Sequence, residues 1–258
     1  MLPWLVVCRW DKIMALKSQF WRQTAFQVSM AVCTIFVILT AVAMLVYPGG
    51  TKTDHSTPGY SFFQDFFSDL GLTKVWSGES NGISSALFVV ALSLAGAMLA
   101  LFFVAFAEFF NRSFRGKSLS RLGSVAGVIS GICFVGIAAA PANNPKGRVP
   151  RACPWVSTLH GWAYGTFVDW AFRMFLLAVV LYTAAILVEH QYPKRLAWVF
   201  ALFAIMLAAH VVLITVGPSS ETPSGLKIQV TGQKRIVYAA IVSIFIQARG
   251  ALIFARSR

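Results

Sequence analysis

Charged residues are scarce in this chain of 258 residues. They make up 12% of it, and only nine are Asp or Glu, whereas 57% of the residues are apolar. This balance excludes a soluble globular protein and indicates an integral membrane protein. The formal net charge of +13 is typical of nucleic-acid binding, but the basic residues stand in short clusters between apolar runs. Such clusters set membrane topology, so no nucleic-acid partner is expected.

Cysteines are few, and several catalytic motifs are missing. Two of the four cysteines, Cys33 and Cys133, lie inside apolar runs, so the chain offers no disulfide framework and no Cys-x-x-Cys metal pair. The chain also has no Gly-rich phosphate loop, no Gly-x-Ser-x-Gly motif and no base-stacking module. Nucleotide hydrolysis, serine esterase chemistry and nucleic-acid binding therefore have no support.

Six apolar runs are long enough to cross the hydrocarbon of a bilayer, which takes about 20 helical residues. We therefore expect an all-α fold, a bundle of six transmembrane helices in a single domain. The runs cover residues 25–47, 83–110, 122–140, 162–188, 196–216 and 236–254.

The N-terminal part of the chain, before the second run, leaves two alternatives open: a cleaved signal peptide in place of a retained first span, and a later start. Ala41-Val42-Ala43 resembles a signal-peptide cleavage site. The apolar run is longer than a signal core of roughly 7 to 15 residues, so we prefer a retained span. Met14 is an alternative start of the chain.

The distribution of basic residues predicts the orientation. With the N-terminus inside, the inner segments carry thirteen basic residues and the outer loops carry eight. This bias places both termini in the cytoplasm, and we expect the inner membrane of a bacterium as the location. The outer loops are long and rich in Pro, Gly and Ser, so the outer face is expected to carry the function. The lipid bilayer is the expected partner, and other membrane-protein subunits are a second candidate.

The first outer loop contains a segment with a helical pattern. At about 100° per residue, Asp65, Asp69 and the other polar residues fall in one arc, and aromatic residues fill the opposite arc. Gly71 suits the left-handed end of such a helix. We expect a short amphipathic helix over residues 58–70, lying flat on the membrane surface with its phenyl rings down.

Three glycines in the third span, Gly123, Gly127 and Gly131, share one helix face at a spacing of four. Small residues at this spacing let a neighbouring helix approach closely. We expect packing inside one bundle, and a dimer interface is the alternative.

Short motifs in residues 47–88 and 138–160 carry a resemblance. They are Tyr47-Pro48-Gly49-Gly50-Thr51, Gly59-Tyr60-Ser61-Phe62-Phe63, Phe67-Ser68-Asp69-Leu70-Gly71, Asn81 with Ser84-Ser85-Ala86-Leu87-Phe88, Ala140-Pro141-Ala142 and Leu159-His160. In this order they resemble a group of uncharacterised prokaryotic six-span membrane proteins, the domain of unknown function nine-nine-eight. The resemblance implies fold and topology and carries no activity. Related proteins tend to have an acidic residue after the Ala-Pro-Ala turn, where this chain has Asn143-Asn144.

The carboxylates of Asp65 and Asp69 would repel each other by a few tenths of a kcal/mol at one helical turn. We prefer the interpretation that the two carboxylates either pair with the basic second outer loop or are simply hydrated. Pairing of the two loops would form a lid over the outer end of the bundle. A bound divalent cation is the alternative, because carboxylate oxygens suit a hard metal. The basic residues of that loop are Lys146, Arg148 and Arg151.

Four further residues complete the candidate polar site on the outer face. Asn81 and Ser84 lie at the entry to the second span, and His160 and His210 are expected near the outer ends of the fourth and fifth spans. We interpret the histidines as packing or interfacial residues. With Asp69 they could hold zinc, as in membrane hydrolases of the ceramidase kind, or they could ligate a haem, although the sequence requires neither cofactor.

Asp169 and Arg173 lie inside the fourth span, with the acid four residues before the cation. This is the favourable order for an intrahelical pair, and charges at that depth are expensive without a partner. We expect a self-neutralising structural pair, and a proton or substrate pathway is the alternative.

The function expected from these residues is non-enzymatic. It is a role in binding, assembly or transport with its functional surface on the outer face. The alternatives are a metal-dependent hydrolase of a lipid, built on His160 and His210, and a small transporter or channel that uses Asp169 and Arg173.

Overall fold

The computed structural model describes residues 3–140 and 154–256, and within them the side chains of residues 23–140 and 164–256. This part of the chain is helical and contains no β-strand, only two isolated β-bridges in one loop. The α-helices are α1 Pro3–Leu45, α2 Gly82–Ala107, α3 Phe114–Ala139, α4 Pro154–Val188, α5 Arg195–Val216 and α6 Pro223–Arg256.

Each of the six helices contains an apolar stretch long enough to cross a membrane. In hydrocarbon the backbone N–H and C=O groups must be satisfied within the segment, which a helix achieves. The expected all-α bundle with six spans is thus confirmed, and the chain is an integral membrane protein. Four of the helices, α1, α3, α4 and α6, begin well before their apolar runs.

Capping residues explain the earlier starts of α3 and α6. α3 begins at Phe114 instead of residue 122, and the Ser113 hydroxyl accepts a hydrogen bond from the Gly116 N–H at 3.0 Å. α6 begins at Pro223 instead of residue 236, and the Thr222 hydroxyl accepts from the Gly225 N–H at 3.2 Å. Side-chain caps and a proline in the first turn favour these starts. The loop before α6 therefore shrinks to residues 217–222.

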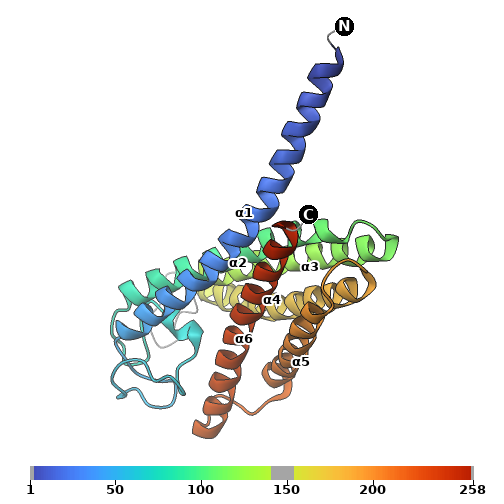
Figure 1. Ribbon diagram of the computed structural model, residues 1–258. Coiled ribbons are helices and arrows are strands. Elements are labelled where there is room, and N and C mark those ends of the chain that lie inside the picture. The colour runs from blue at the N-terminus through green and yellow to red at the C-terminus, as the bar shows by residue number, and fades with distance from the viewer. Residues whose placement is uncertain (1–2, 141–153, 257–258) are drawn as a thin grey trace.

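The helices form a closed ring (Figure 1). Each helix packs against the next one along the chain, and α6 packs against α1. The loops of residues 46–81 and 217–222 lie at one end of the ring, which we call the loop end. α1 continues beyond the bundle at its N-terminal end.

A cluster of aromatic side chains packs the end of the ring opposite the loop end. Phe106 stacks on Phe102 with the ring centres 5.2 Å apart, and it meets Tyr192 edge to face at 5.5 Å. Tyr182, from α4, lies 5.1 Å from Phe106. Each such pair contributes about 0.5–1.5 kcal/mol beyond its buried area. This end is therefore held by apolar packing, whereas polar contacts gather at the loop end.

Close backbone contact joins α2 and α3. A Cβ added at Gly96 would lie 2.5 Å from the carbonyl oxygen of Gly131. On the same face of α3, Gly127 lies against the Phe103 ring and Gly123 against the Tyr182 ring of α4. The three glycines of α3 thus lie against two neighbouring helices of one bundle.

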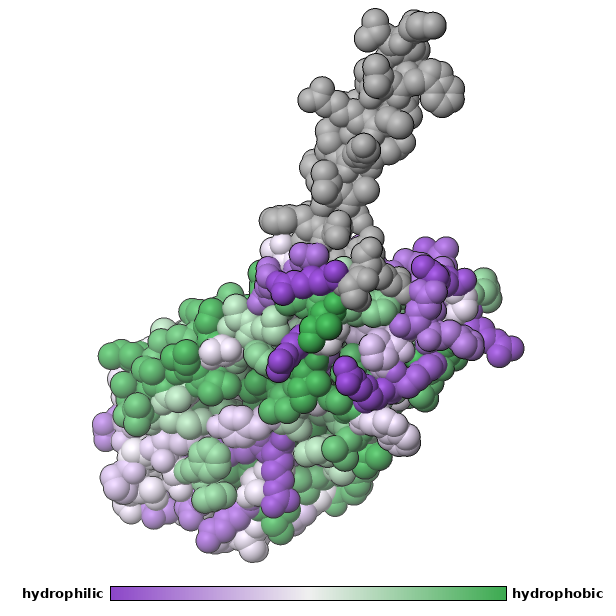
Figure 2. Space-filling model, viewed as in Figure 1, coloured by the Kyte–Doolittle hydropathy of each residue, from purple (hydrophilic) through white to green (hydrophobic). Residues whose placement is uncertain are grey.

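The surface agrees with a membrane setting. Figure 2 shows hydrophobic residues over much of the middle of the visible face, with hydrophilic residues gathered towards its ends. Exposed large apolar side chains occur on all six helices, among them Ile38, Val104, Ile132, Leu187, Ile205 and Ile253. Such a surface is stable against lipid chains and not against water.

Replacing Gly131 with Ala should lower the free energy of unfolding by about 1–3 kcal/mol, because the new methyl group meets the α2 backbone, which cannot move aside. Chemical unfolding of the purified protein in detergent measures this. Gly165→Ala in α4 is the control, since an added Cβ there meets nothing within 4 Å and Ala favours a helix. Equal stability of the two variants would contradict the role of the α2–α3 contact.

Candidate functional site

The segment that was expected to be an amphipathic helix has a different structure. In place of a helix over residues 58–70, the chain forms turns followed by a short 3₁₀-helix, η1, at Phe67–Gly71. Asp65 and Asp69 are buried, with exposed fractions of 0% and 6%, whereas the side chain of Phe63 is 59% exposed. The expected helix is therefore wrong, and so is the expected exposure of its polar face.

Local hydrogen bonds explain the difference. The carboxylate of Asp65 accepts from the backbone N–H of Ser61 at 2.7 Å, and that of Asp69 accepts from the N–H of Phe66 at 2.7 Å. Side chains that bind nearby backbone N–H groups compete with the helical pattern. Gly71 lacks the expected positive φ. Instead it allows close packing on α2, since a Cβ there would lie 2.8 Å from the Phe88 ring.

A buried lysine of α6 holds this segment. The Lys234 ammonium donates to the backbone carbonyl of Asp65. It also lies 5.1, 4.9 and 5.6 Å from the ring centres of Tyr60, Phe62 and Phe67. The neighbouring Gln233 accepts from the Phe67 N–H at 2.7 Å. Cation–π contacts contribute about 0.5–2 kcal/mol each when desolvated, so α6 fixes η1 strongly.

The first turn of α2 holds the other side of η1. The amide of Asn81 donates to the carbonyl oxygens of Leu70 and Leu72 at 3.0 and 2.8 Å. The hydroxyls of Ser84 and Ser85 donate to the carbonyls of Leu70 and Gly71 at 3.4 and 3.0 Å. Of the candidate polar residues, Asp69 belongs to η1, and Asp65, Asn81 and Ser84 lie next to it. Two of them bind its carbonyl groups directly.

Several buried polar atoms beside η1 have no hydrogen-bond partner within the described residues. They are Tyr47 Oη, Asp65 Oδ1 and Asn81 Oδ1. Buried polar groups are normally paired, with protein or with ordered water. This mixture of donors and acceptors suits hydrogen bonds to water or to a small polar group.

Burial changes the acidity of both carboxyl groups. It raises the pKa of Asp65 to about 7, although the Ser61 N–H opposes the rise. Burial also raises the pKa of Asp69 to about 6, although the Phe66 N–H, the Trp76 indole and the nearby Lys234 ammonium oppose the rise. The Asp65 pKa therefore falls near neutral pH, and protonation relieves the cost of burying its charge.

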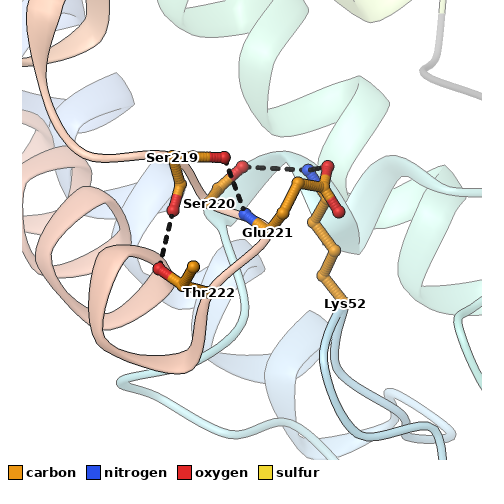
Figure 3. Close-up of polar contacts among 5 residues, drawn as sticks. All are labelled: Lys52, Ser219, Ser220, Glu221 and Thr222. Atoms are coloured by element: carbon orange, nitrogen blue, oxygen red, sulfur yellow. Dashed lines mark hydrogen bonds and ion pairs between the residues drawn. The ribbon is translucent and has the colours of Figure 1, made fainter.

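A second contact ties the 46–81 loop to the loop before α6 (Figure 3). The Lys52 ammonium lies 2.7 Å from a Glu221 carboxylate oxygen and donates to the Ser220 hydroxyl at 2.9 Å. Figure 3 also shows the Ser219 hydroxyl accepting from the Glu221 N–H, and its carbonyl accepting from Thr222. The Glu221 side chain is 74% exposed, so this ion pair contributes at most about 1 kcal/mol.

The expected partners of Asp65 and Asp69 in the second outer loop, Lys146, Arg148 and Arg151, lie outside the described residues. Among the side chains of residues 23–140 and 164–256, no three His, Cys, Asp or Glu come together as a metal site would require. These side chains therefore provide no group of three ligands for the divalent cation or the zinc ion that the sequence suggested as alternatives.

The structure places His210 inside the bundle. Its ring meets Phe172 of α4 edge to face at 4.9 Å, and its Nδ1 atom lies close to Gly232 of α6. Within the part of the chain that the structure describes, neither ring nitrogen has a hydrogen-bond partner. His160 belongs to α4, but its side chain lies outside the described residues, so a shared zinc or haem stays untested.

Asp169 and Arg173 form the pair that their spacing predicts. Arg173 Nη2 lies 2.9 Å from Asp169 Oδ1, and the two side chains are 48% and 42% exposed. They line an open groove of about 640 Å³ between α4 and α5, to which α5 contributes Ile214 and Thr215. The pair therefore lies on the outside of the ring.

The centre of the ring contains an apolar cavity of about 90 Å³. All six helices contribute to its lining, and no polar atom does. The lining includes one residue from each helix, in the order α1 to α6: Cys33, Leu92, Phe134, Phe175, Leu207 and Ile244.

The residues of α6 that bind η1 were not predicted from the sequence. Lys234 and Gln233 were assigned to a loop because the apolar run starts after them. The signal that could have placed them on a helix is Thr222-Pro223, a capping residue followed by a proline suited to the first turn. Nothing in the sequence pairs them with η1, because Phe67 and Gln233 are 166 residues apart along the chain.

Comparisons with known proteins add no relative: no family model, no curated protein and no solved structure matches the chain. The resemblance to the six-span group of unknown function therefore stays a prediction.

Replacing Asp65 with Asn should stabilise the protein at pH 8 by on the order of a few kcal/mol. The ordinary pKa is 3.8, and the folded value is about 7. Between these values the folded state keeps a proton that the unfolded chain releases, so the free energy of unfolding of the natural protein falls as pH rises through this window. Unfolding measured from pH 4 to 8 should show a smaller fall for Asp65→Asn.

Asp54→Asn is the matched control. The Asp54 carboxylate is exposed, and hydrogen bonds from Ser56 and Thr57 lower its pKa. Its replacement removes no buried charge, so no gain in stability is expected at pH 8. A pH profile of Asp65→Asn that matches the natural protein would show that burial does not raise the Asp65 pKa.

Replacing Lys234 with Met should loosen η1, because the segment loses a charged hydrogen bond and three cation–π contacts. Amide hydrogen exchange of residues 60–72 should speed up about tenfold or more, while the ends of the helices away from the loop keep their protection. Arg235→Met, at the exposed neighbouring position, should leave exchange unchanged. Equal exchange in both variants would remove Lys234 from this role.

Proposed function

We propose that this protein is a non-enzymatic binding protein of the membrane. It holds a small apolar molecule, or the end of an alkyl chain, at the centre of its helix ring. The observation that carries the proposal is the central cavity, to which every helix contributes apolar atoms only. Apolar cavities bind apolar molecules, as an engineered cavity of about 150 Å³ binds benzene.

The position of the 46–81 loop supports a lid over this cavity. Phe36 lines the cavity, and its ring centre lies 6.4 Å from that of Phe67 in η1. Val237 and Ile241 of α6 also line the cavity and pack against the apolar cluster beneath η1. A molecule that enters from the loop end must therefore displace η1.

The loop end is the outer face in this proposal. The excess of Lys and Arg on the side of the termini favours cytoplasmic termini, and the location is the inner membrane of a bacterium. The lid then faces the compartment outside that membrane, where it controls access to the cavity.

The two alternative functions have less support. A lipid hydrolase needs a metal site, and among the described side chains no two further metal-binding residues join His210. Transport through the ring needs polar groups along its centre, whereas Asp169 and Arg173 face the groove outside the ring. Binding in the central cavity therefore accounts best for the arrangement of the side chains.

Filling the cavity should abolish binding. Ala240 lines the cavity, so Ala240→Leu places three further carbon atoms in it. Molecules extracted from the purified protein are identified by mass spectrometry. The natural protein should retain an apolar molecule at near one per chain, and Ala240→Leu should retain at least tenfold less, which corresponds to about 1.4 kcal/mol.

Ala209→Leu is the control, because Ala209 is exposed on α5. It should bind as the natural protein does. Xenon is a second probe: its NMR shift should respond to the natural protein and to Ala209→Leu, and not to Ala240→Leu. Equal retention and equal xenon response in all three proteins would disprove the proposal.

A further inference from the structure

The ion pair of α4 faces away from the centre of the ring. Phe175, on the opposite side of α4, lines the central cavity. Asp169 and Arg173 share the outer side with Leu177 and Val180, which are 44% and 47% exposed. This side of the helix therefore faces lipid in the membrane, and the two charges lie within the same stripe as apolar side chains.

The depth of the pair makes exposure expensive. The apolar run of α4 begins at residue 162, on the loop end. At about 1.5 Å per residue, Asp169 lies roughly 10 Å and Arg173 roughly 16 Å below that start. Charged side chains at such depth are rare and need partners. Within the described residues the Arg173 guanidinium contacts only Asp169, a contact that uses a fraction of its five N–H donors.

The groove around the pair has the size and lining of a site for an amphipathic molecule. Its volume of about 640 Å³ lies within the usual range of ligand sites. Tyr164 and Thr215 contribute hydroxyl groups, and Ile214 and Val168 contribute apolar surface. Trp170 also lines the groove and is 50% exposed.

We propose that this groove binds the headgroup of a zwitterionic phospholipid, phosphatidylethanolamine, from the leaflet on the loop-end side. The Arg173 guanidinium binds the phosphate, because its planar fork matches phosphate oxygens. The Asp169 carboxylate faces the ammonium group, and the acyl chains lie along Leu177 and Val180. One molecule thus supplies both opposite charges and the apolar cover for the rest of the stripe. Asp169 also sets specificity, because it repels an anionic headgroup that has no ammonium group.

Native mass spectrometry of the purified protein tests this. The protein in detergent is mixed with phosphatidylethanolamine or with phosphatidylglycerol, and lipid adducts are counted. The natural protein should bind phosphatidylethanolamine at least tenfold more tightly than phosphatidylglycerol, and excess inorganic phosphate should not displace it. Arg173→Leu should lower the affinity for phosphatidylethanolamine at least tenfold, because at least one charge-assisted hydrogen bond to the phosphate is lost. Asp169→Asn should remove the preference by strengthening phosphatidylglycerol binding.

Two further variants keep the result interpretable. Arg249→Leu removes an exposed arginine from α6 and should leave lipid binding unchanged. Arg173→Lys keeps the charge and should restore part of the binding even if Arg173→Leu folds poorly. Equal adducts in the natural protein, Arg173→Leu and Asp169→Asn would overturn the proposal. A dimer that separates on Arg173→Leu without any lipid preference would also overturn it, because a second copy would then cover the groove.

Discussion

The buried ammonium group of Lys234 is the interaction on which the loop end depends. It reaches from α6 to the carbonyl of Asp65 and lies among three aromatic rings of the 46–81 loop. A desolvated cation is costly unless its surroundings replace water, and here a carbonyl, π-faces and two nearby carboxyl groups do so. The same contacts bring Asp65 and Asp69 into the interior. The loop is thus held by electrostatic interactions in a structure whose other end is held by aromatic packing.

The ring of helices separates two environments. Its centre is apolar, and all six helices line the cavity there. Its outer side carries a groove with the Asp169–Arg173 pair. This distribution is the reverse of a channel, in which polar groups line the centre and apolar groups face lipid. It suits a protein that binds apolar molecules inside and polar parts of lipids outside.

The sequence predicts the spans because hydrocarbon leaves the backbone no partner but itself, so each apolar run long enough to cross becomes a helix. It also predicts the Asp169–Arg173 contact, since residues four apart are neighbours on a helix. The structure of η1 is not predictable in this way. Its form depends on Lys234, which is 169 residues away from Asp65 in the sequence, and on Asn81 and the serines of α2. The side of α4 that faces lipid likewise depends on how the ring closes.

The length of α6 links the loop to the membrane itself. This helix has 34 residues, or about 51 Å, against a hydrocarbon thickness of about 30 Å. Its first turns carry the exposed Lys227 and Arg235, which favour the headgroup region, so these turns rise above the hydrocarbon or the helix tilts. Because η1 is attached to this part of α6, the thickness of the bilayer sets the height of η1. A thicker bilayer would draw the attachment point towards lipid, and a thinner one would leave it in water.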